Sequence, residues 1–351
     1  MEEIGNWESF KRKPIEAMAV DKNLTFLSGL TDRVINGADI TRSEAMYILS
    51  LRTQEGIVML LAHATILRNH FKGNRIDLCA VVNAKSGRCT EDCIFCAQSA
   101  RHKTDIKTYP LMSTSKVIKA SSVAGGAGAH RLGIVTSGKG ITNREELERI
   151  GEFIKEISKS STITPCASLG VLSDEQLSRL RDAGLKRYHH NLETAESHFF
   201  KICSTHTYKE RVHTILMVKK KGFEVCSGGI FGLGETPEQR VELAFALKDL
   251  EVDSVPLNFL NPVKGTPAEK QPLLPPLEIL KIIALFRFVL PKKDIRVSGG
   301  REVALRTLQP LMYLAGANGT MVGNYLTTIG RDARVDLQEI LDLGFASLPE
   351  R

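Results

Sequence analysis

A series of eight short β-branched runs, each followed by an amphipathic segment, constrains this chain more than any other feature of its sequence. The runs cover residues 76–84, 130–136, 162–170, 186–192, 223–233, 253–262, 294–300 and 319–324. Strands that alternate with helices pair in parallel, because each helix carries the chain back to the edge where the next strand begins. Eight such units close into a barrel, so the sequence predicts an α/β fold of the (β/α)8 TIM type.

Helix signals separate these runs. In a capping box, a Ser or Thr side chain pairs with a Glu or Gln three residues later. Such boxes stand at Thr142–Glu145, Ser173–Gln176 and Thr236–Gln239. Glycines favour the residue just past a helix end, where Gly184 and Gly222 are placed. An open doubly wound sheet is the alternative, but no G-x-G-x-x-G follows the first run.

The first 75 residues follow a different pattern. A capping box at Thr41 and Glu44 precedes an apolar helical segment, and a second helical run extends from about Thr53 to Phe71. Neither segment has a strand to pair with. We therefore expect an N-terminal helical extension over residues 1–75, and a barrel with a C-terminal segment over residues 76–351.

Composition argues against two classes of partner. The net charge is +7, but Lys and Arg are scattered and aromatic residues make up only 6%. A nucleic-acid platform needs clustered basic residues with stacking rings. The longest apolar run, residues 57–67, contains His63 and is too short to span a bilayer, and the N-terminus lacks the apolar core of a signal peptide. We expect a cytoplasmic protein without nucleic-acid or membrane partners.

Three of the seven cysteines stand together in GRCTEDCIFCAQSA, residues 87–100. Cys89, Cys93 and Cys96 follow the first strand run directly, where barrel enzymes carry their site residues. An odd cysteine count without a secretory signal favours metal binding over disulfides. Structural zinc sites close with four ligands, whereas an iron–sulfur cube held by three cysteines leaves one iron open to a small molecule. A zinc-stabilised, non-enzymatic module is the alternative.

The cysteine spacing, with Phe95 directly before Cys96, resembles the signature of the radical S-adenosylmethionine superfamily. Four further stretches make the chain similar to the biotin synthase family: YHHNLET (188–194), CSGGIFGLGET (226–236), VPLNFLNPVKGTP (255–267) and RVSGGRE (296–302). The resemblance spans about residues 75–330. Another radical enzyme of the same subgroup, such as a hydrogenase-cofactor maturase, is the alternative.

The resemblance implies a reaction and its cofactors. A [4Fe–4S] cluster on Cys89, Cys93 and Cys96 would bind S-adenosylmethionine at its open iron and generate a deoxyadenosyl radical. That radical would abstract hydrogen from dethiobiotin, and an auxiliary iron–sulfur cluster would donate the sulfur that completes biotin. An electron donor of the flavodoxin or ferredoxin type and a homodimer are also implied.

The auxiliary cluster is where the chain departs from the family. In the common form, three cysteines and one arginine hold a [2Fe–2S] centre, and Cys166, Cys226 and Arg296 match three of those positions as catalytic ligands. Gly133 stands where the remaining cysteine is expected, whereas Cys79 replaces a residue that is usually serine.

Side chains alternate along residues 76–84, so Cys79 shares a face with Asp77, Val81 and Asn83 and is expected to point into the barrel. We therefore predict that Cys79, Cys166 and Cys226 hold the auxiliary cluster. A cubane with an extra sulfide is the alternative to [2Fe–2S], and Cys203 is the fallback ligand.

Further contacts follow from the resemblance. Those implied for S-adenosylmethionine are Phe95, Asn191, Glu193 and Ile230, and those for dethiobiotin are Asn191, Asn258, Thr327 and Thr328. Amide and hydroxyl side chains suit a urea-like ring, which has two N–H donors and one carbonyl. Radical abstraction needs no general base, so His189, His190 and His206 are expected to be structural.

Overall fold

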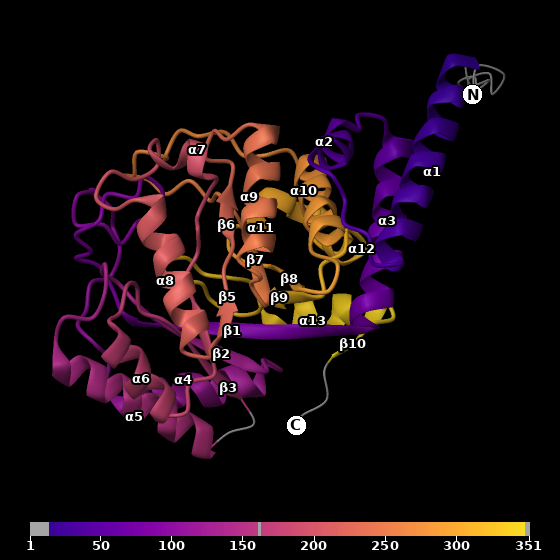
Figure 1. Cartoon of the computed structure of the whole chain (residues 1–351). Coiled ribbons are helices and arrows are strands. Elements are labelled where there is room, and N and C mark those ends of the chain that lie inside the picture. Colours follow the sequence, from indigo (N-terminus) through magenta and orange to yellow (C-terminus); the bar gives the residue numbers. More distant parts are fainter. Residues whose placement is uncertain (1–13, 161–162, 348–351) are drawn as a thin grey trace, which may run out of the picture.

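A closed barrel of parallel strands forms the centre of the computed structural model, which describes residues 14–160 and 163–347 (Figure 1). Its strands are β1 Arg75–Lys85, β2 Arg131–Thr136, β3 Thr164–Ser168, β4 Arg187–His189, β5 Glu224–Cys226, β6 Gly229–Phe231, β7 Ser254–Phe259, β8 Asp294–Val297 and β9 Gly319–Met321. β1 pairs with both β2 and β9, which closes the ring. The predicted (β/α)8 fold is therefore confirmed.

The fifth strand position is divided. β5 ends at Cys226 and β6 begins at Gly229, and both pair with β7. Between them, the Ser227 N–H donates to Ser254 O and the Gly228 N–H donates to the side-chain oxygen of Asn191. The break thus places one backbone donor on β7 and one on a side chain that follows β4, at a strand that the sequence suggested to be continuous.

Helices surround the barrel and follow its strands. Their bounds are α1 Pro14–Ile35, α2 Arg42–Ser50, α3 Gln54–Lys72, α4 Thr114–Gly126, α5 Arg144–Ser160, α6 Asp174–Asp182, α7 Glu196–Phe199, α8 Tyr208–Lys220, α9 Pro237–Asp249, α10 Pro276–Val289, α11 Arg301–Leu305, α12 Leu311–Leu314 and α13 Ala333–Asp342. A 3-10 turn, Arg306–Leu308, and a short strand β10, Ala346–Ser347, complete the described chain.

Most of the predicted helix caps are present. Capping boxes begin α2 at Thr41, α6 at Ser173 and α9 at Thr236. The box predicted at Thr142 is wrong by one residue, because the side chain of Asn143 accepts the Glu145 N–H at 2.7 Å. Asparagine is at least as good a helix cap as threonine, and here it takes the position.

The helical extension packs against the barrel's own helix α10. The buried Lys281 ammonium on α10 donates to the carbonyl oxygens of Leu49 and Leu51, both at 3.0 Å. α1 and α3 lie side by side at the right of Figure 1, away from α4–α6. Residues 1–13 lie outside the described part, and the division at residue 75 stays a prediction.

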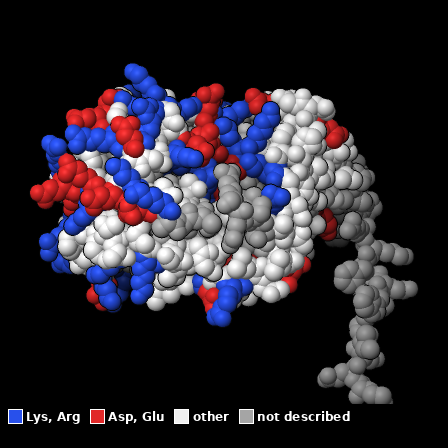
Figure 2. All heavy atoms as spheres, turned by 90° about the horizontal axis from the view of Figure 1, so that it is seen from below, with Lys and Arg blue, Asp and Glu red and all other residues white. Residues whose placement is uncertain are grey.

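The surface shown in Figure 2 carries both signs of charge. Blue and red side chains are interspersed over the half of this face on the side of α4–α6, while the opposite half is largely uncharged. Over residues 14–160 and 163–347, every helix is too short or too polar to cross a lipid bilayer.

Candidate active site

One cavity inside the barrel brings together fourteen residues that the sequence singled out as site candidates, while the fallback ligand Cys203 is not part of its lining. Its volume is about 480 Å³. The lining includes Cys79, Cys89, Cys93, Phe95, Cys96, Cys166, Asn191, Glu193, Cys226, Ile230, Asn258, Arg296, Thr327 and Thr328. These residues are spread over some 250 positions of sequence, and barrel closure alone makes them neighbours.

The loop after β1 presents three cysteines to this cavity. Cys89 and Cys93 are buried, and the loop is tied to itself because the Cys89 N–H donates to Gln98 O at 3.0 Å and the Ala100 N–H to Cys89 O at 2.7 Å. Burial raises the pKa of the Cys96 thiol to about 11, although the backbone groups of Gln98 and Ser99 oppose the shift.

The same loop is suited to bind an anionic iron–sulfur cluster. Backbone groups of Glu91 and Gly138 hydrogen-bond the Cys89 sulfur, and those of Gln98 and Ser99 the Cys96 sulfur. Hydrogen bonds of this kind stabilise a thiolate over a thiol. Cysteine thiolates are the protein ligands of iron–sulfur clusters, so the donor set fits the cluster that the sequence predicts.

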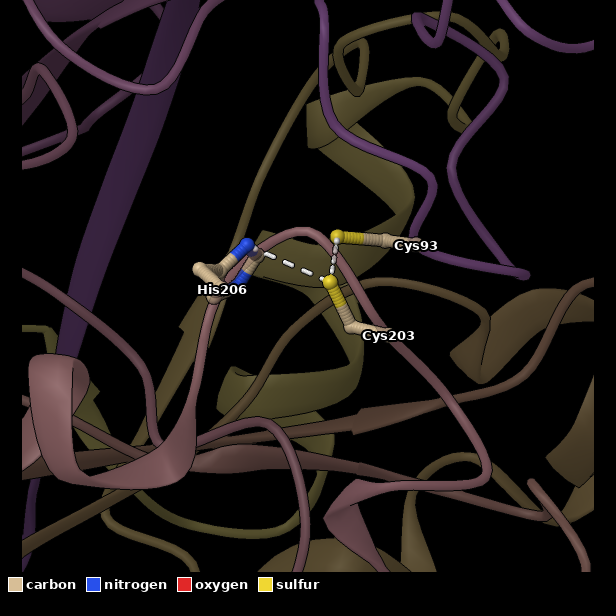
Figure 3. Close-up of side chains that lie close together, drawn as sticks. All are labelled: Cys93, Cys203 and His206. Carbon is tan, nitrogen blue, oxygen red and sulfur yellow. Dashed lines mark hydrogen bonds between the residues drawn. The ribbon is translucent and has the colours of Figure 1, made fainter.

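A second segment, after β4, lies directly beside this loop (Figure 3). Cys203 Sγ is 3.7 Å from Cys93 Sγ and 3.2 Å from His206 Nδ1. The Cys93 thiol donates to the Cys203 sulfur, and this hydrogen bond together with burial raises the pKa of Cys93. Sequence reasoning treated His206 as structural and Cys203 as a fallback for the auxiliary cluster. Cys203 instead contacts the cysteine loop.

Asn191 and Glu193 follow β4 at the cavity wall. The Asn191 amide donates to a Glu193 carboxylate oxygen at 3.2 Å, and its own oxygen accepts the Gly228 N–H at 3.1 Å. Glu193 has φ +72°, an unusual backbone conformation for a residue other than glycine. The Ile230 N–H holds it there by donating to Glu193 O at 2.7 Å. Strained residues of this kind cluster at functional sites.

At the opposite end of the cavity, Cys79, Cys166 and Cys226 lie near one another and near Arg296. Cys79 hydrogen-bonds Arg296, and Arg296 pairs with the Asp77 carboxylate at 2.7 Å. Burial by itself favours the neutral form of Arg296, but the adjacent Cys79 and Asp77 raise its pKa. The predicted inward face of β1, with Asp77 and Cys79, is thus the one observed.

At Gly133, where the family's remaining cysteine is expected, a neighbouring side chain lies close to the place that a cysteine side chain would take. It pairs with Val81 on one side and with Cys166 on the other. A Cβ atom at residue 133 would lie 3.2 Å from Val81 Cγ1, which is tighter than ordinary packing. Val81 therefore occupies the space that a side chain from β2 would need.

Near the cavity mouth, Asn258 and the loop after β9 carry the predicted substrate contacts. The Asn258 amide donates to Gly229 O at 3.2 Å and accepts the Gly299 N–H at 2.9 Å. The Asn258 amide can still form further hydrogen bonds, since it has two donor hydrogens and two lone pairs and uses one of each in these contacts. Thr327 is exposed, and Thr328 O accepts the Tyr325 N–H at 3.0 Å.

Comparison with known proteins gives the family of the chain. Residues 84–247 match the radical SAM superfamily, and residues 256–346 match the Biotin and Thiamin Synthesis associated domain. The biotin synthase of Geobacter sulfurreducens is 50% identical, over 92% of this chain and 97% of that protein. The chain belongs to the biotin synthase family. The biotin synthase of Carboxydothermus hydrogenoformans is 48% identical over 90% of this chain and 97% of that protein.

Solved structures support the same fold. Methylornithine synthase aligns with a TM-score of 0.80 over 92% of this chain and 98% of that one, at 23% identity. The [FeFe]-hydrogenase maturase HydG aligns with a TM-score of 0.78 over 97% of this chain and 80% of that one, at 15% identity. These identities support the barrel fold alone, so they do not favour the maturase alternative. Family membership implies a [4Fe–4S] cluster, S-adenosylmethionine and an auxiliary iron–sulfur cluster, and it excludes the non-enzymatic zinc module.

Proposed function

We propose that this chain converts dethiobiotin to biotin inside the barrel, with sulfur taken from an auxiliary iron–sulfur cluster. One observation carries the proposal: all fourteen candidate residues line a single cavity, in a chain that is 50% identical to a biotin synthase. A cavity of about 480 Å³ is in the range of small-molecule sites. Its position in a closed barrel also suits radical chemistry, which must exclude water and other reactants.

Cys89, Cys93 and Cys96 are the proposed ligands of the [4Fe–4S] cluster. When bound, that cluster supplies the electron that cleaves S-adenosylmethionine and so releases the radical that abstracts hydrogen. The chain contributes the positions of the ligands. Hydrogen bonds within the Cys89–Ala100 loop fix its path, and Phe95 lies at the cavity beside the sulfurs.

Asn191, Glu193 and Ile230 are proposed to orient S-adenosylmethionine. The Glu193 carboxylate, partnered by the Asn191 amide, suits ribose hydroxyls, which donate hydrogen bonds to carboxylate oxygens. The Ile230 N–H is already taken by Glu193 O. The adenine contact proposed for Ile230 must therefore use its side chain or its carbonyl oxygen.

Cys79, Cys166 and Cys226 are proposed to hold the auxiliary cluster. Arg296 lies beside them, and its ion pair with Asp77 favours a role as a nearby positive charge over that of a metal ligand. This assignment changes the expectation for Arg296. Three thiolates leave one cluster position without a protein ligand, which is suited to a sulfur atom that must depart.

Substrate contacts are proposed for Asn258, Thr327 and Thr328, with Asn191 shared between substrate and cofactor. Asn258 stands on β7 next to β6, while the two threonines stand on the loop after β9. The ureido ring would thus be held from both sides of the cavity mouth.

An electron donor of the flavodoxin or ferredoxin type is proposed to approach the cysteine loop. Three exposed lysines, Lys103, Lys201 and Lys264, lie on this loop's continuation or on neighbouring segments. Two of them are on segments that the loop contacts, since the Ile94 N–H donates to Ile202 O and Ile94 O accepts the Ala268 N–H. Activity with an acidic donor should therefore fall at high salt. The homodimer and the cytoplasmic location stay predictions.

The test is anaerobic turnover of the reconstituted chain with dethiobiotin, S-adenosylmethionine and a reductant. Biotin and deoxyadenosine should both form. Deoxyadenosine without biotin would instead favour a different radical enzyme of this subgroup. If a fully reconstituted, brown protein formed no product at all, that result would contradict the proposal.

A further inference from the structure

Cys203 and His206 have no part in the function proposed above, yet they lie against the cluster ligand Cys93 (Figure 3). The three ligand atoms lie within 4.8 Å of one another. Cys93 and Cys203 are buried, and the His206 side chain is 8% exposed. These three side chains therefore offer two sulfurs and a nitrogen that converge on one point away from bulk solvent.

Two of the three separations are close to those expected around a tetrahedral metal ion, and the third is within 4.8 Å. Two sulfurs bonded to such an ion at about 2.3 Å stand about 3.8 Å apart, and a sulfur and a nitrogen about 3.6 Å apart. The observed separations are 3.7 Å for the two sulfurs and 3.2 Å for Cys203 Sγ to His206 Nδ1. Glu91 Oε2 lies 2.5 Å from His206 Nδ1 but is not among the three atoms that lie within 4.8 Å of one another, so the fourth position is left for a water molecule.

Hydrogen bonds from the Asp92 side chain and from the backbone hold the two segments together without any metal. The Asp92 carboxylate accepts the N–H groups of Ser204 and Thr205 at 2.9 and 3.2 Å. The Ile94 N–H donates to Ile202 O at 2.9 Å. Because these bonds flank both cysteines, Cys203 is placed beside Cys93 in the folded chain itself.

We propose that the chain, before its cluster is assembled, binds a single ferrous ion through Cys93, Cys203 and His206. The two thiols release their protons on binding, so two thiolates balance the 2+ charge of the ion. Sulfur and imidazole ligands together suit Fe²⁺ and its analogues Co²⁺ and Zn²⁺. The inference rests on the proposed function in one respect: Cys93 is also a cluster ligand, so the single ion and the complete cluster exclude one another.

Metal binding requires one rearrangement. Arg211 Nε donates to His206 Nε2 at 3.1 Å, so the ring proton is on Nδ1. An ion at Nδ1 moves that proton to Nε2, and Arg211 must then release the imidazole. Arg211 keeps its bond to Asn191 O at 2.9 Å and its ion pair with Glu193 at 3.5 Å.

Cobalt is the probe that tests this site. The metal-free chain with Cys166→Ala, which weakens the auxiliary thiol site, is titrated with Co²⁺ under anaerobic conditions. We expect one equivalent to give the visible bands of tetrahedral cobalt with sulfur-to-cobalt charge transfer. Cys203→Ser should weaken this binding by about 100-fold, because loss of outer-shell partners alone already costs 10–100-fold in metal affinity.

Cys96→Ser is the matched control, since Cys96 belongs to the proposed cluster but not to the single-ion site. It should keep the cobalt bands and lose the [4Fe–4S] absorption after reconstitution, while Cys203→Ser should do the reverse. His206→Gln should behave as Cys203→Ser does, which guards against a folding defect in one variant. Cobalt bands that survive in Cys203→Ser, or vanish in Cys96→Ser, would overturn the inference. A [4Fe–4S] cluster that survives Cys96→Ser would instead contradict the proposed function.

Discussion

Replacing Gly229 with alanine should disturb the S-adenosylmethionine end of the cavity specifically. A Cβ atom at this residue would lie 2.6 Å from Glu193 O and 2.8 Å from Leu243 Cδ2. Both atoms must move, and the Glu193 carbonyl accepts the Ile230 N–H at 2.7 Å. Overpacking of this kind costs about 1–3 kcal/mol, and the lost hydrogen bond adds about 0.5–1.5 kcal/mol.

The combined destabilisation is therefore about 1.5–4.5 kcal/mol. With an unfolding entropy of about 2.1 cal/mol/K per residue, a chain of 351 residues should lose roughly 2–6 °C in melting temperature. Displacement of the Glu193 backbone should also remove one charged hydrogen bond to the cofactor. That is worth about 1.5–3 kcal/mol, or roughly a 10- to 100-fold rise in the Kd for S-adenosylmethionine.

Thermal unfolding and calorimetric titration of reconstituted protein with S-adenosylmethionine measure the two effects. Gly125→Ala is the control, because Gly125 lies in α4 and a methyl group there would meet no atom within 4 Å. It should leave affinity unchanged and stability equal or slightly higher. If Gly229→Ala bound the cofactor as tightly as Gly125→Ala, the assignment of Glu193 as a positioned ligand would be wrong.

Three further outcomes are expected. Cys79→Ala should remove the iron and sulfide of the auxiliary cluster while the [4Fe–4S] spectrum persists, and unchanged metal content would refute the ligand role. Arg301→Met breaks a buried pair with Asp336 at 2.7 Å, while Arg331 still pairs with that carboxylate. It should destabilise the fold to urea by about 1–3 kcal/mol, whereas Arg334→Met, on an exposed helix end, should change little. Burial lowers the pKa of His63, so below pH about 6.5 the unfolded chain binds more protons than the folded chain, and stability falls as the pH drops. His63→Gln should therefore make the free energy of unfolding depend less steeply on pH between pH 7.5 and 5. An identical pH dependence in this variant would contradict the reasoning.

The fold was largely predictable because its signals are local. Alternation of strand runs and capping boxes is written into short segments, and the strands and most of the caps follow it. The error at Thr142 arose because Asn143 competes for the same cap within one residue. The break between β5 and β6 was not predictable, since it depends on Asn191 and Ser254, which lie far away in sequence.

The candidate site divides in the same way. The cysteine motif and the inward face of β1 are periodic features that a sequence displays. The contact between Cys203 and Cys93 joins positions separated by 110 residues, and it depends on Asp92, whose carboxylate binds the backbone of Ser204 and Thr205. No local sequence pattern predicts that a carboxylate will bind a distant backbone segment. The spacing of Cys203 and His206, three residues apart, could however have indicated a pair of metal ligands.

Closure of the barrel through β1 and β9 has a consequence for synthesis of the chain. The cysteines of residues 89–96 leave the ribosome long before Gly319–Met321, the strand that completes the ring. At 5–20 residues per second, the roughly 230 residues between them take on the order of 10–50 s to add. During that interval the barrel has not yet closed around the thiols, so oxygen and free metal ions reach them most easily during translation.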